Sequence, residues 1–232
     1  MIGIIGAMEI EIELINEQMK NKKSRVINGI TFTTGFINSQ KLVTAVCGMG
    51  KVNAAICAQT MICIYNPDEI INTGVAGGID QRLKVGDIVI SEGLYEHDLD
   101  ITSLGYPLGF ISGADITKIP SNREITLKLY NLANKILECN IITGIIVSGD
   151  QFINSEDKKA FLKEKFNAAA CEMEGAAIGH VCYMNHVPFT VVRAVSDNAG
   201  GGADMDFNTF AKIAARNSSK LITEYVNTKG SN

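Results

Sequence analysis

The sequence predicts an α/β fold in which helices cover a largely parallel sheet. Short apolar runs of the kind that form strands alternate along the chain with longer segments of helical periodicity. Several of these runs are apolar on both faces, which is typical of parallel strands buried between helices. The 232 residues are 46% hydrophobic and 20% charged, so the chain can bury a sizeable core.

In chain order, strands are predicted at residues 2–6, 42–47, 69–73, 87–91, 144–148 and 188–195, because each is a short apolar run and several end in Gly, Ser or Asp. Helices are predicted at 8–20, 51–65, 121–139, 155–165, 173–186 and 207–227, where the spacing of apolar residues is helical. No internal repeat or linker divides these elements, so we expect one domain over residues 1–232.

The composition argues against several classes of partner. The formal net charge is -4 and lysine and arginine form no cluster, which argues against binding to nucleic acid or to an anionic membrane. The six cysteines lie in apolar contexts and never form a C-x-x-C pair, so we expect buried thiols and no zinc. No signal peptide and no apolar run of membrane-spanning length is evident, and we expect a cytoplasmic protein that binds a small molecule.

The ligand site is predicted at the carboxyl ends of the strands, where open α/β sheets bind their ligands. The segments that follow apolar runs there are 7–11, 74–78, 149–153 and 196–198. The glycines of segment 74–78 are weak grounds for a phosphate-binding loop, because no Walker lysine accompanies them. The opening IGIIGAM is no dinucleotide fingerprint either, since a third glycine in register is missing.

Glu11 is out of place on the first predicted helix. Glu9, Glu13 and Glu17 share one polar sector of the helical wheel, whereas Glu11 points to the apolar side. One interpretation is a side chain that snorkels at the edge of the apolar face. The other is a buried general base at the end of the first strand, where desolvation raises the pKa of the carboxyl and suits it to take a proton from water.

The stretch CEMEGAA places two carboxylates, Glu172 and Glu174, among small and apolar residues. A helix start, with acids near the positive end of the helix dipole, is one explanation. Arg193 suggests another, because a guanidinium inside the last predicted strand needs a carboxylate or a ligand oxygen as its partner. Ser196 and Asp197 end that strand, where the aspartate either serves the site or caps the next segment.

The remaining motifs point to structural roles or to an interface. His97 and the acids after it resemble a metal-binding set, but neighbouring strand residues point to opposite faces, which favours a structural or rim role. His180 and His186 lie in an apolar helix and are interpreted as hydrogen-bonded structural residues. The loop 101–113 is rich in large apolar residues, so we expect it to cover a ligand or to meet another subunit.

Seven motifs cover the chain nearly from end to end: IGIIGAMEIEIELI, CGMGKVNAA, IINTGVAGG, KVGDIVIS, IVSGDQFI, CEMEGAAIGHVC and VPFTVVRAVSDNA. Together they resemble the 5′-methylthioadenosine/S-adenosylhomocysteine nucleosidases, a group within the purine nucleoside phosphorylase-like superfamily. The resemblance implies a three-layer α/β/α sandwich with a central mixed, largely parallel sheet. It also implies no metal or organic cofactor, and a homodimer in which loop 101–113 lies near the partner subunit.

The resemblance further implies that the protein hydrolyses the bond between adenine and a 5′-thio-substituted ribose. Methylthioadenosine and S-adenosylhomocysteine are the implied substrates, and 5′-deoxyadenosine is a further candidate. By motif, Glu11 in GAMEIE would activate the attacking water, and Asp197 in AVSDN would protonate adenine N7 as the base departs. Glu174, the second acid of E-M-E, would accept hydrogen bonds from the ribose hydroxyls.

The same carry-over by motif assigns the walls of the pocket. Met173 would pack against the sugar, Phe152 would stack on adenine, and the backbone of Ile153 would read the edge of the base. Arg193 would hold the carboxylates or the water near the ribose. The implied binding set is completed by Met8, Gly77, Ser196 and Phe207.

Val75 departs from the family pattern, because relatives often carry serine or threonine at this position. The loss of one hydroxyl contact, worth about 1 kcal/mol, would alter how Asp197 is positioned. Three alternatives stay open: a phosphorolytic relative, a nucleoside-binding protein without turnover, and a nucleosidase for a 6-amino-6-deoxyfutalosine-type substrate. A phosphorylase needs a basic anion pocket near the first strand, and Glu11 would repel phosphate there.

Overall fold

In the computed structural model, the described residues are 1–197 and 207–230, less the side chains of residues 197 and 207–213. The strands are β1 (Ile2–Gly6), β2 (Lys20–Ile27), β3 (Ile30–Ile37), β4 (Gln40–Val46), β5 (Glu69–Gly78), β6 (Ile88–Glu96), β7 (Ile119–Pro120), β8 (Ile141–Ser148), β9 (Ala168–Glu172) and β10 (Phe189–Asp197). The helices are α1 (Glu9–Gln18), α2 (Lys51–Tyr65), α3 (Arg123–Ile136), α4 (Glu156–Phe166), α5 (Gly175–Met184) and α6 (Phe207–Lys229), with a 3₁₀ turn η1 at Thr102–Leu104.

The strands of the described residues form one mixed sheet in the order β10-β6-β8-β9-β5-β1-β4-β3-β2, with β7 paired to β6. β5 also pairs with β10, so these two strands close a ring with β6, β8 and β9. Parallel pairings join β1 to β4 and β5, β5 to β10, and β8 to β6 and β9. The pairings β2–β3, β3–β4, β5–β9, β6–β7 and β6–β10 are antiparallel. The predicted mixed sheet is therefore confirmed.

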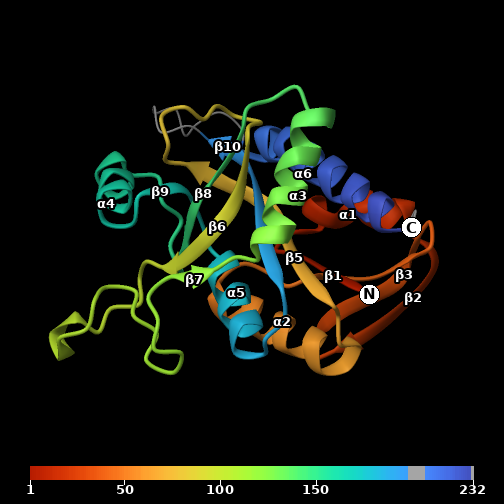
Figure 1. The fold of residues 1–232 in the computed structure, drawn as a ribbon, viewed down its shortest axis with the longest axis horizontal. Helices are drawn as coiled ribbons and strands as arrows, with labels where there is room; N and C mark the ends of the chain where they lie inside the picture. The colour runs from red at the N-terminus through yellow and green to blue at the C-terminus, as the bar shows by residue number, and fades with distance from the viewer. Residues whose placement is uncertain (198–206, 231–232) are drawn as a thin grey trace.

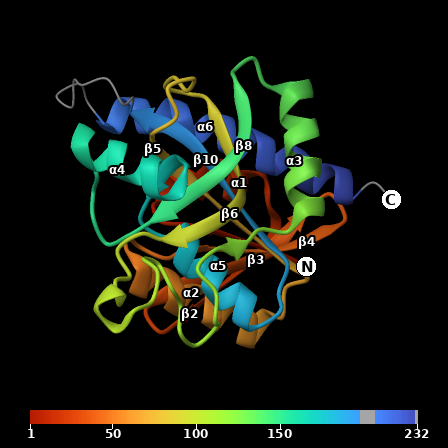
Figure 2. The same ribbon diagram turned by 60° about the vertical axis from the view of Figure 1, so that its left-hand side comes forward.

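Helices cover the sheet from two sides, as Figure 1 and Figure 2 show. On one side α1, α3 and α6 bury Ile12, Leu129 and Tyr225 in a common apolar cluster. On the other side α2 and α5 pack together and bury residues such as Met61 and Ile178. Because helices flank both faces, the sequences of the central strands are nearly continuous apolar runs. The predicted three-layer arrangement is confirmed.

All six predicted strands and all six predicted helices are present, with ends displaced by a few residues. The sequence interpretation missed β2, β3, β7 and β9. The β2–β3 hairpin turns at Asn28 and Gly29, both with positive φ, but β2 is an exposed edge strand rich in lysine and has no apolar run. β9 was missed because alanine, its main residue, is depleted in strands.

The cysteines and the helix lengths bear on two further expectations. All six cysteines are free of disulfide bonds, and four of them are buried. Cys139 is half-buried, and the expectation of a buried thiol is wrong for Cys63, which lies on the solvent side of α2. Within the described part of the chain, no helix combines the length and the apolar character needed to cross a membrane.

Candidate active site

One pocket collects side chains from the carboxyl ends of several strands. Its lining consists of Ala7, Met8, Glu11, Met49, Val75, Ala76, Gly77, Gln151, Phe152, Ile153, Cys171, Glu172, Met173, Glu174 and Ser196. Eight of these are predicted site residues: Met8, Glu11, Gly77, Phe152, Ile153, Met173, Glu174 and Ser196. Arg193 does not line the pocket but binds Glu172, which does. The side chains of Asp197 and Phe207 lie outside the described residues.

Glu11 turns into the protein at the start of α1, as its place on the helical wheel suggested. Its side chain is buried, and Oε2 accepts hydrogen bonds from the backbone N–H groups of Ala7 (2.7 Å) and Met8 (3.0 Å). Oε1 accepts the N–H of Val75 on β5 at 3.0 Å. A Cβ atom at residue 74 would lie 2.5 Å from Oε1, so Gly74 is the residue that leaves room for this carboxylate.

The surroundings of Glu11 act on its proton affinity in opposite directions. Burial raises the pKa of the Glu11 carboxyl, while the charge of Arg193 and the three backbone N–H donors lower it, and the net effect is a pKa above the ordinary value. The carboxylate therefore keeps its hydrogen-bonded orientation and has an increased affinity for a proton. These are the properties of a general base directed at a bound water.

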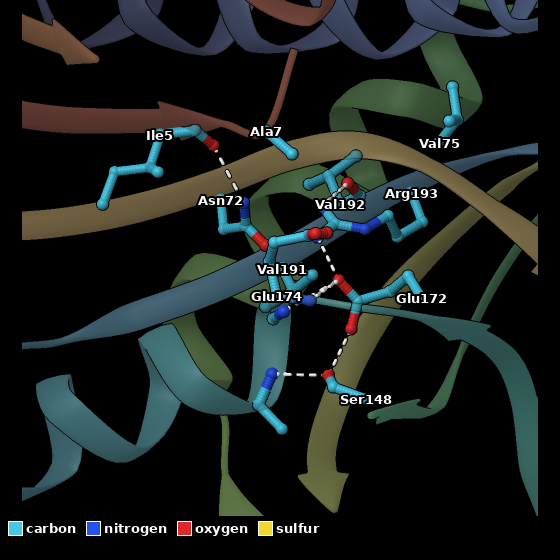
Figure 3. A network of polar contacts seen from close by, with 12 residues as sticks. Ile5, Ala7, Asn72, Val75, Ser148, Glu172, Glu174, Val191, Val192 and Arg193 are labelled. Carbon is cyan, nitrogen blue, oxygen red and sulfur yellow. Dashed lines mark hydrogen bonds and ion pairs between the residues drawn. The ribbon is translucent and has the colours of Figure 1, made fainter. Parts of the chain in front are cut away.

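Arg193 is the cation behind the pocket, and Figure 3 shows its contacts. The side chain is 1% exposed and belongs to the central strand β10. Its Nη2 donates to Glu172 Oε2 and to Asn72 Oδ1, and the Asn72 amide in turn donates to the carbonyl of Ile5 at 2.9 Å. Glu174 Oε2 lies 4.0 Å from Nη2. The expectation that Arg193 pairs with the acids of CEMEG is confirmed, and Glu172 is its closer partner.

Glu172 links Arg193 to the start of α5. Its Oε2 accepts the backbone N–H groups of Glu174 (3.0 Å) and Gly175 (2.8 Å), and the Ser148 hydroxyl donates to Oε1. Burial alone would raise the pKa of Glu172, but Arg193 and these donors hold it below the ordinary value. The helix-start explanation is thus correct for Glu172. This residue also forms the ion pair with Arg193, which the sequence analysis assigned to the acids of CEMEG without choosing between them.

Glu174 is buried between these groups and the start of α2. Its Oε1 accepts the backbone N–H of Gly50 at 2.9 Å. Burial first, and the neighbouring charge of Glu172 second, raise the pKa of Glu174 to about 7. The pocket therefore contains two buried carboxyls, Glu11 and Glu174, that hold a proton more tightly than ordinary glutamates do.

The residues that line the pocket differ widely in exposure, from an exposed rim to a buried floor. Phe152 is 64% exposed at the edge of the pocket, whereas Ser196 is buried with its hydroxyl 3.4 Å from the carbonyl of Ala76. Gly77 has no side chain, so it lines the pocket with its backbone, and it pairs with Cys171 of β9. An aromatic face at the edge and backbone along the floor suit a flat heterocyclic ligand.

Two of the three histidines, His97 and His180, lie in structural surroundings, whereas the prediction that His186 lies in the helix is wrong, because α5 ends at Met184 and His186 is exposed. His180 Nδ1 lies 2.9 Å from Glu96 Oε1, which confirms its interpretation as a hydrogen-bonded residue. His97 is buried next to Gly149, and burial lowers the pKa of its ring. The acids after His97 do not join it in one metal-binding set, because Asp98 binds Lys51 and Asp100 binds Thr102.

Comparisons with known proteins identify the family of the chain. A family model described as the Phosphorylase superfamily matches residues 1–227. The chain is 37% identical over 227 residues to a 5′-methylthioadenosine/S-adenosylhomocysteine nucleosidase of Psychromonas ingrahamii, covering 97% of this chain and 98% of the relative. The chain belongs to this nucleosidase family within the phosphorylase superfamily. The resemblance noted in the motifs is therefore confirmed.

Two solved structures extend the comparison. The nucleosidase of Neisseria meningitidis in complex with methylthio-immucillin-A matches with a TM-score of 0.93 at 38% identity, over 98% of each chain. The futalosine hydrolase of Helicobacter pylori strain 26695 matches with a TM-score of 0.92 at 33% identity, over 98% of this chain and 97% of that one. The nucleoside phosphorylase-like fold is thus shared along nearly the whole chain.

The pKa of Glu174 predicts a specific dependence of stability on pH. Between pH 4.5 and about 7 the folded protein keeps a proton on Glu174 that the unfolded chain has lost, so the free energy of unfolding falls as pH rises. Glu174→Gln removes this titration. Over this pH range the free energy of unfolding of the wild type should fall by about 3 kcal/mol more than that of the variant, and above about pH 7 the two should change in parallel. Urea unfolding at a series of pH values measures the difference, and a constant difference would contradict the assignment.

Proposed function

We propose that the protein hydrolyses the N-glycosidic bond of 5′-methylthioadenosine and S-adenosylhomocysteine, releasing adenine and the 5′-thio-substituted ribose. The observation that carries this proposal is a pair of buried carboxyls, Glu11 and Glu174, that open onto one pocket. No lysine, arginine or histidine is among the described residues that line it, so the pocket suits water better than phosphate as the attacking group. Family membership supports the same reaction.

Glu11 is the proposed base and Asp197 the proposed acid. Water attacks the anomeric carbon, the bond from that carbon to adenine breaks, Glu11 takes a proton from the water, and Asp197 gives a proton to N7 of the departing base. Adenine is a poor leaving group as an anion, so the proton from Asp197 is needed as the bond loosens. The three N–H donors around Glu11 fix its oxygens before the substrate arrives.

The other pocket residues orient the two halves of the nucleoside. Glu174 accepts hydrogen bonds from the ribose hydroxyls, and in its ionised form it also stabilises positive charge that develops on the sugar. Met173 packs against the sugar. Phe152 stacks on adenine and the backbone of Ile153 reads the edge of the base. The proposed pocket is completed by Met8, Gly77, Ser196 and Phe207, with Arg193 holding the carboxylates from behind.

A second candidate is a 6-amino-6-deoxyfutalosine-type substrate. The observation that favours it is the match to a futalosine hydrolase along 98% of this chain at 33% identity. The base and the ribose would meet the same residues in either case. The two candidates, and 5′-deoxyadenosine with them, differ only in the group attached to the 5′ carbon.

We also propose that two chains associate and that the protein works in the cytoplasm, in methionine salvage. Loop 101–113 projects from the body of the molecule in Figure 1, and its Leu104 is 73% exposed. Tyr106 stacks on Phe110 at 4.6 Å between ring centroids and is itself 45% exposed. Apolar groups in such a loop favour burial by a partner subunit. The six free thiols favour a reducing compartment.

A panel of 5′-substituted adenosines tests the reaction. Purified protein should release free adenine from methylthioadenosine and S-adenosylhomocysteine in phosphate-free buffer, as measured by chromatography, and the panel should include 5′-deoxyadenosine and 6-amino-6-deoxyfutalosine. Adenine release that requires phosphate would identify a phosphorylase instead. Stoichiometric binding of methylthioadenosine with no release over long incubation would identify a binding protein.

Replacement of Glu11 tests its role as the base. Glu11→Gln keeps the shape of the side chain but cannot accept a proton, so turnover should fall by about 100- to 10,000-fold while ligand still binds. Glu13→Gln is the matched control, because Glu13 is an exposed glutamate one half-turn further along α1. Steady-state kinetics of both variants measure the effect, and full activity in Glu11→Gln would remove the assignment.

Replacement of Leu104 tests the proposed association. Sedimentation velocity should give the wild type a mass twice that of one chain. Leu104→Asp places a charge in the apolar loop, so the variant should dissociate into single chains at a higher protein concentration than the wild type does. A wild-type protein that sediments as one chain at micromolar concentration would contradict the proposal.

A further inference from the structure

A second polar cluster lies beside the pocket and does not line it. Lys51, the first residue of α2, donates from Nζ to Glu96 Oε2 at 3.0 Å and to Asp98 Oδ1 at 2.7 Å. Glu96 also binds His180 of α5. The Lys51 side chain is only 17% exposed, so these contacts are largely screened from water and are stronger than those of a surface ion pair.

Three residues of this cluster form a closed ring. Lys51 Nζ binds Asp98 Oδ1, the other oxygen of Asp98 accepts the backbone N–H of Asp150 at 2.8 Å, and Asp150 Oδ1 accepts the backbone N–H of Lys51 at 2.7 Å. We call these residues the Lys51 ring. It joins the start of α2 to the segments that follow β6 and β8, which are far apart in the sequence.

Two members of the ring, Lys51 and Asp150, are adjacent in sequence to residues that contact or line the pocket. Gly50, next to Lys51, donates its N–H to Glu174 Oε1 at 2.9 Å. Gly50 has a φ of +96°, and a Cβ atom there would lie 3.0 Å from Asp150 Oδ1, so the ring closes tightly against this glycine. On the other side, Asp150 is followed directly by pocket residues that include Phe152 and Ile153.

We propose that Lys51 is a positioning residue that sets the pocket wall on the base side and the carboxylate on the sugar side at a fixed separation. This inference rests on the proposed function, in which Phe152 meets adenine and Glu174 meets the ribose. Lys51 acts through Asp98 and Asp150 and touches no substrate. A nucleoside bridges the two walls, so its affinity depends on their separation.

The charge of Lys51 is what keeps the ring closed. Without it, Asp98 and Glu96 would face each other as largely buried carboxylates, with His180 as the other described hydrogen-bond partner of Glu96. Their repulsion would open the contact between Asp98 and the segment after β8. The hydrogen bond that the Lys51 backbone N–H donates to Asp150 Oδ1 would then lose its support, and Gly50 would move relative to Glu174.

Kinetics of three variants test the proposal. Lys51→Met removes the charge and retains the apolar stem, and it should raise KM for methylthioadenosine by about tenfold or more while kcat changes less. Lys51→Arg restores a cation and should bring KM back near the wild-type value. Lys229→Met is the matched control, because Lys229 also pairs with a buried glutamate, Glu69, but at the start of β5, the opposite end of that strand from the pocket.

The readouts separate positioning from folding and from the proposed function. A purely structural loss lowers the amount of active enzyme, so it would reduce kcat without changing KM, and that result would overturn the proposal. A crystal structure of Lys51→Met supplies a readout that needs no activity: the distance from Gly50 N to Glu174 Oε1 should exceed that of a hydrogen bond. An unchanged distance would overturn the proposal even if the wild type cleaves another nucleoside, whereas a wild type that releases no adenine counts against the proposed function.

Discussion

A guanidinium buried within the sheet is the constraint on which the pocket depends. Arg193 pairs along the backbone with Gly74 of β5 on one side and Val89 of β6 on the other, so its side chain starts from the middle of the strand ring. Such a cation is tolerated only with hydrogen-bonded anionic partners, because removal of one partner from a buried pair costs about 3–5 kcal/mol. Glu172 satisfies this requirement, and through its bonds to Glu174 and Gly175 it also fixes where α5 begins.

One cation shared among three carboxyls explains why their proton affinities differ. Glu172 has the direct contact with Arg193, which holds its pKa low. The pKa of Glu174 is raised first by burial and second by the charge of Glu172, and this carboxyl stands 4.0 Å from the guanidinium. Arg193 acts on Glu11 only through its charge, without a hydrogen bond, and the pKa of Glu11 is determined mainly by burial. The fold therefore assigns one carboxyl to structure and leaves two with raised proton affinity at the pocket, which suits chemistry that moves protons.

The sequence predicted the parts of this arrangement that have a local signal. The apolar runs revealed the central strands, and the helical wheel singled out Glu11 because a single residue faced the wrong side. The different roles of Glu172 and Glu174 have no such signal, because the two acids lie two residues apart in one motif and only the contact with Arg193 in the folded protein distinguishes them. The Lys51 ring was missed for the same reason: its contacts join residues 47, 52 and 99 positions apart.

Val75 illustrates how backbone contacts limit the effect of a changed side chain. The family pattern to which the motifs point has a hydroxyl at this position, and valine has none to offer. The contact that the structure gives to Glu11 comes from the Val75 N–H, which every residue except proline supplies in an extended strand. The proposed base is therefore held in the same way whatever side chain stands at position 75. The effect that we expect of the valine is therefore on substrate preference and rate rather than on the kind of reaction.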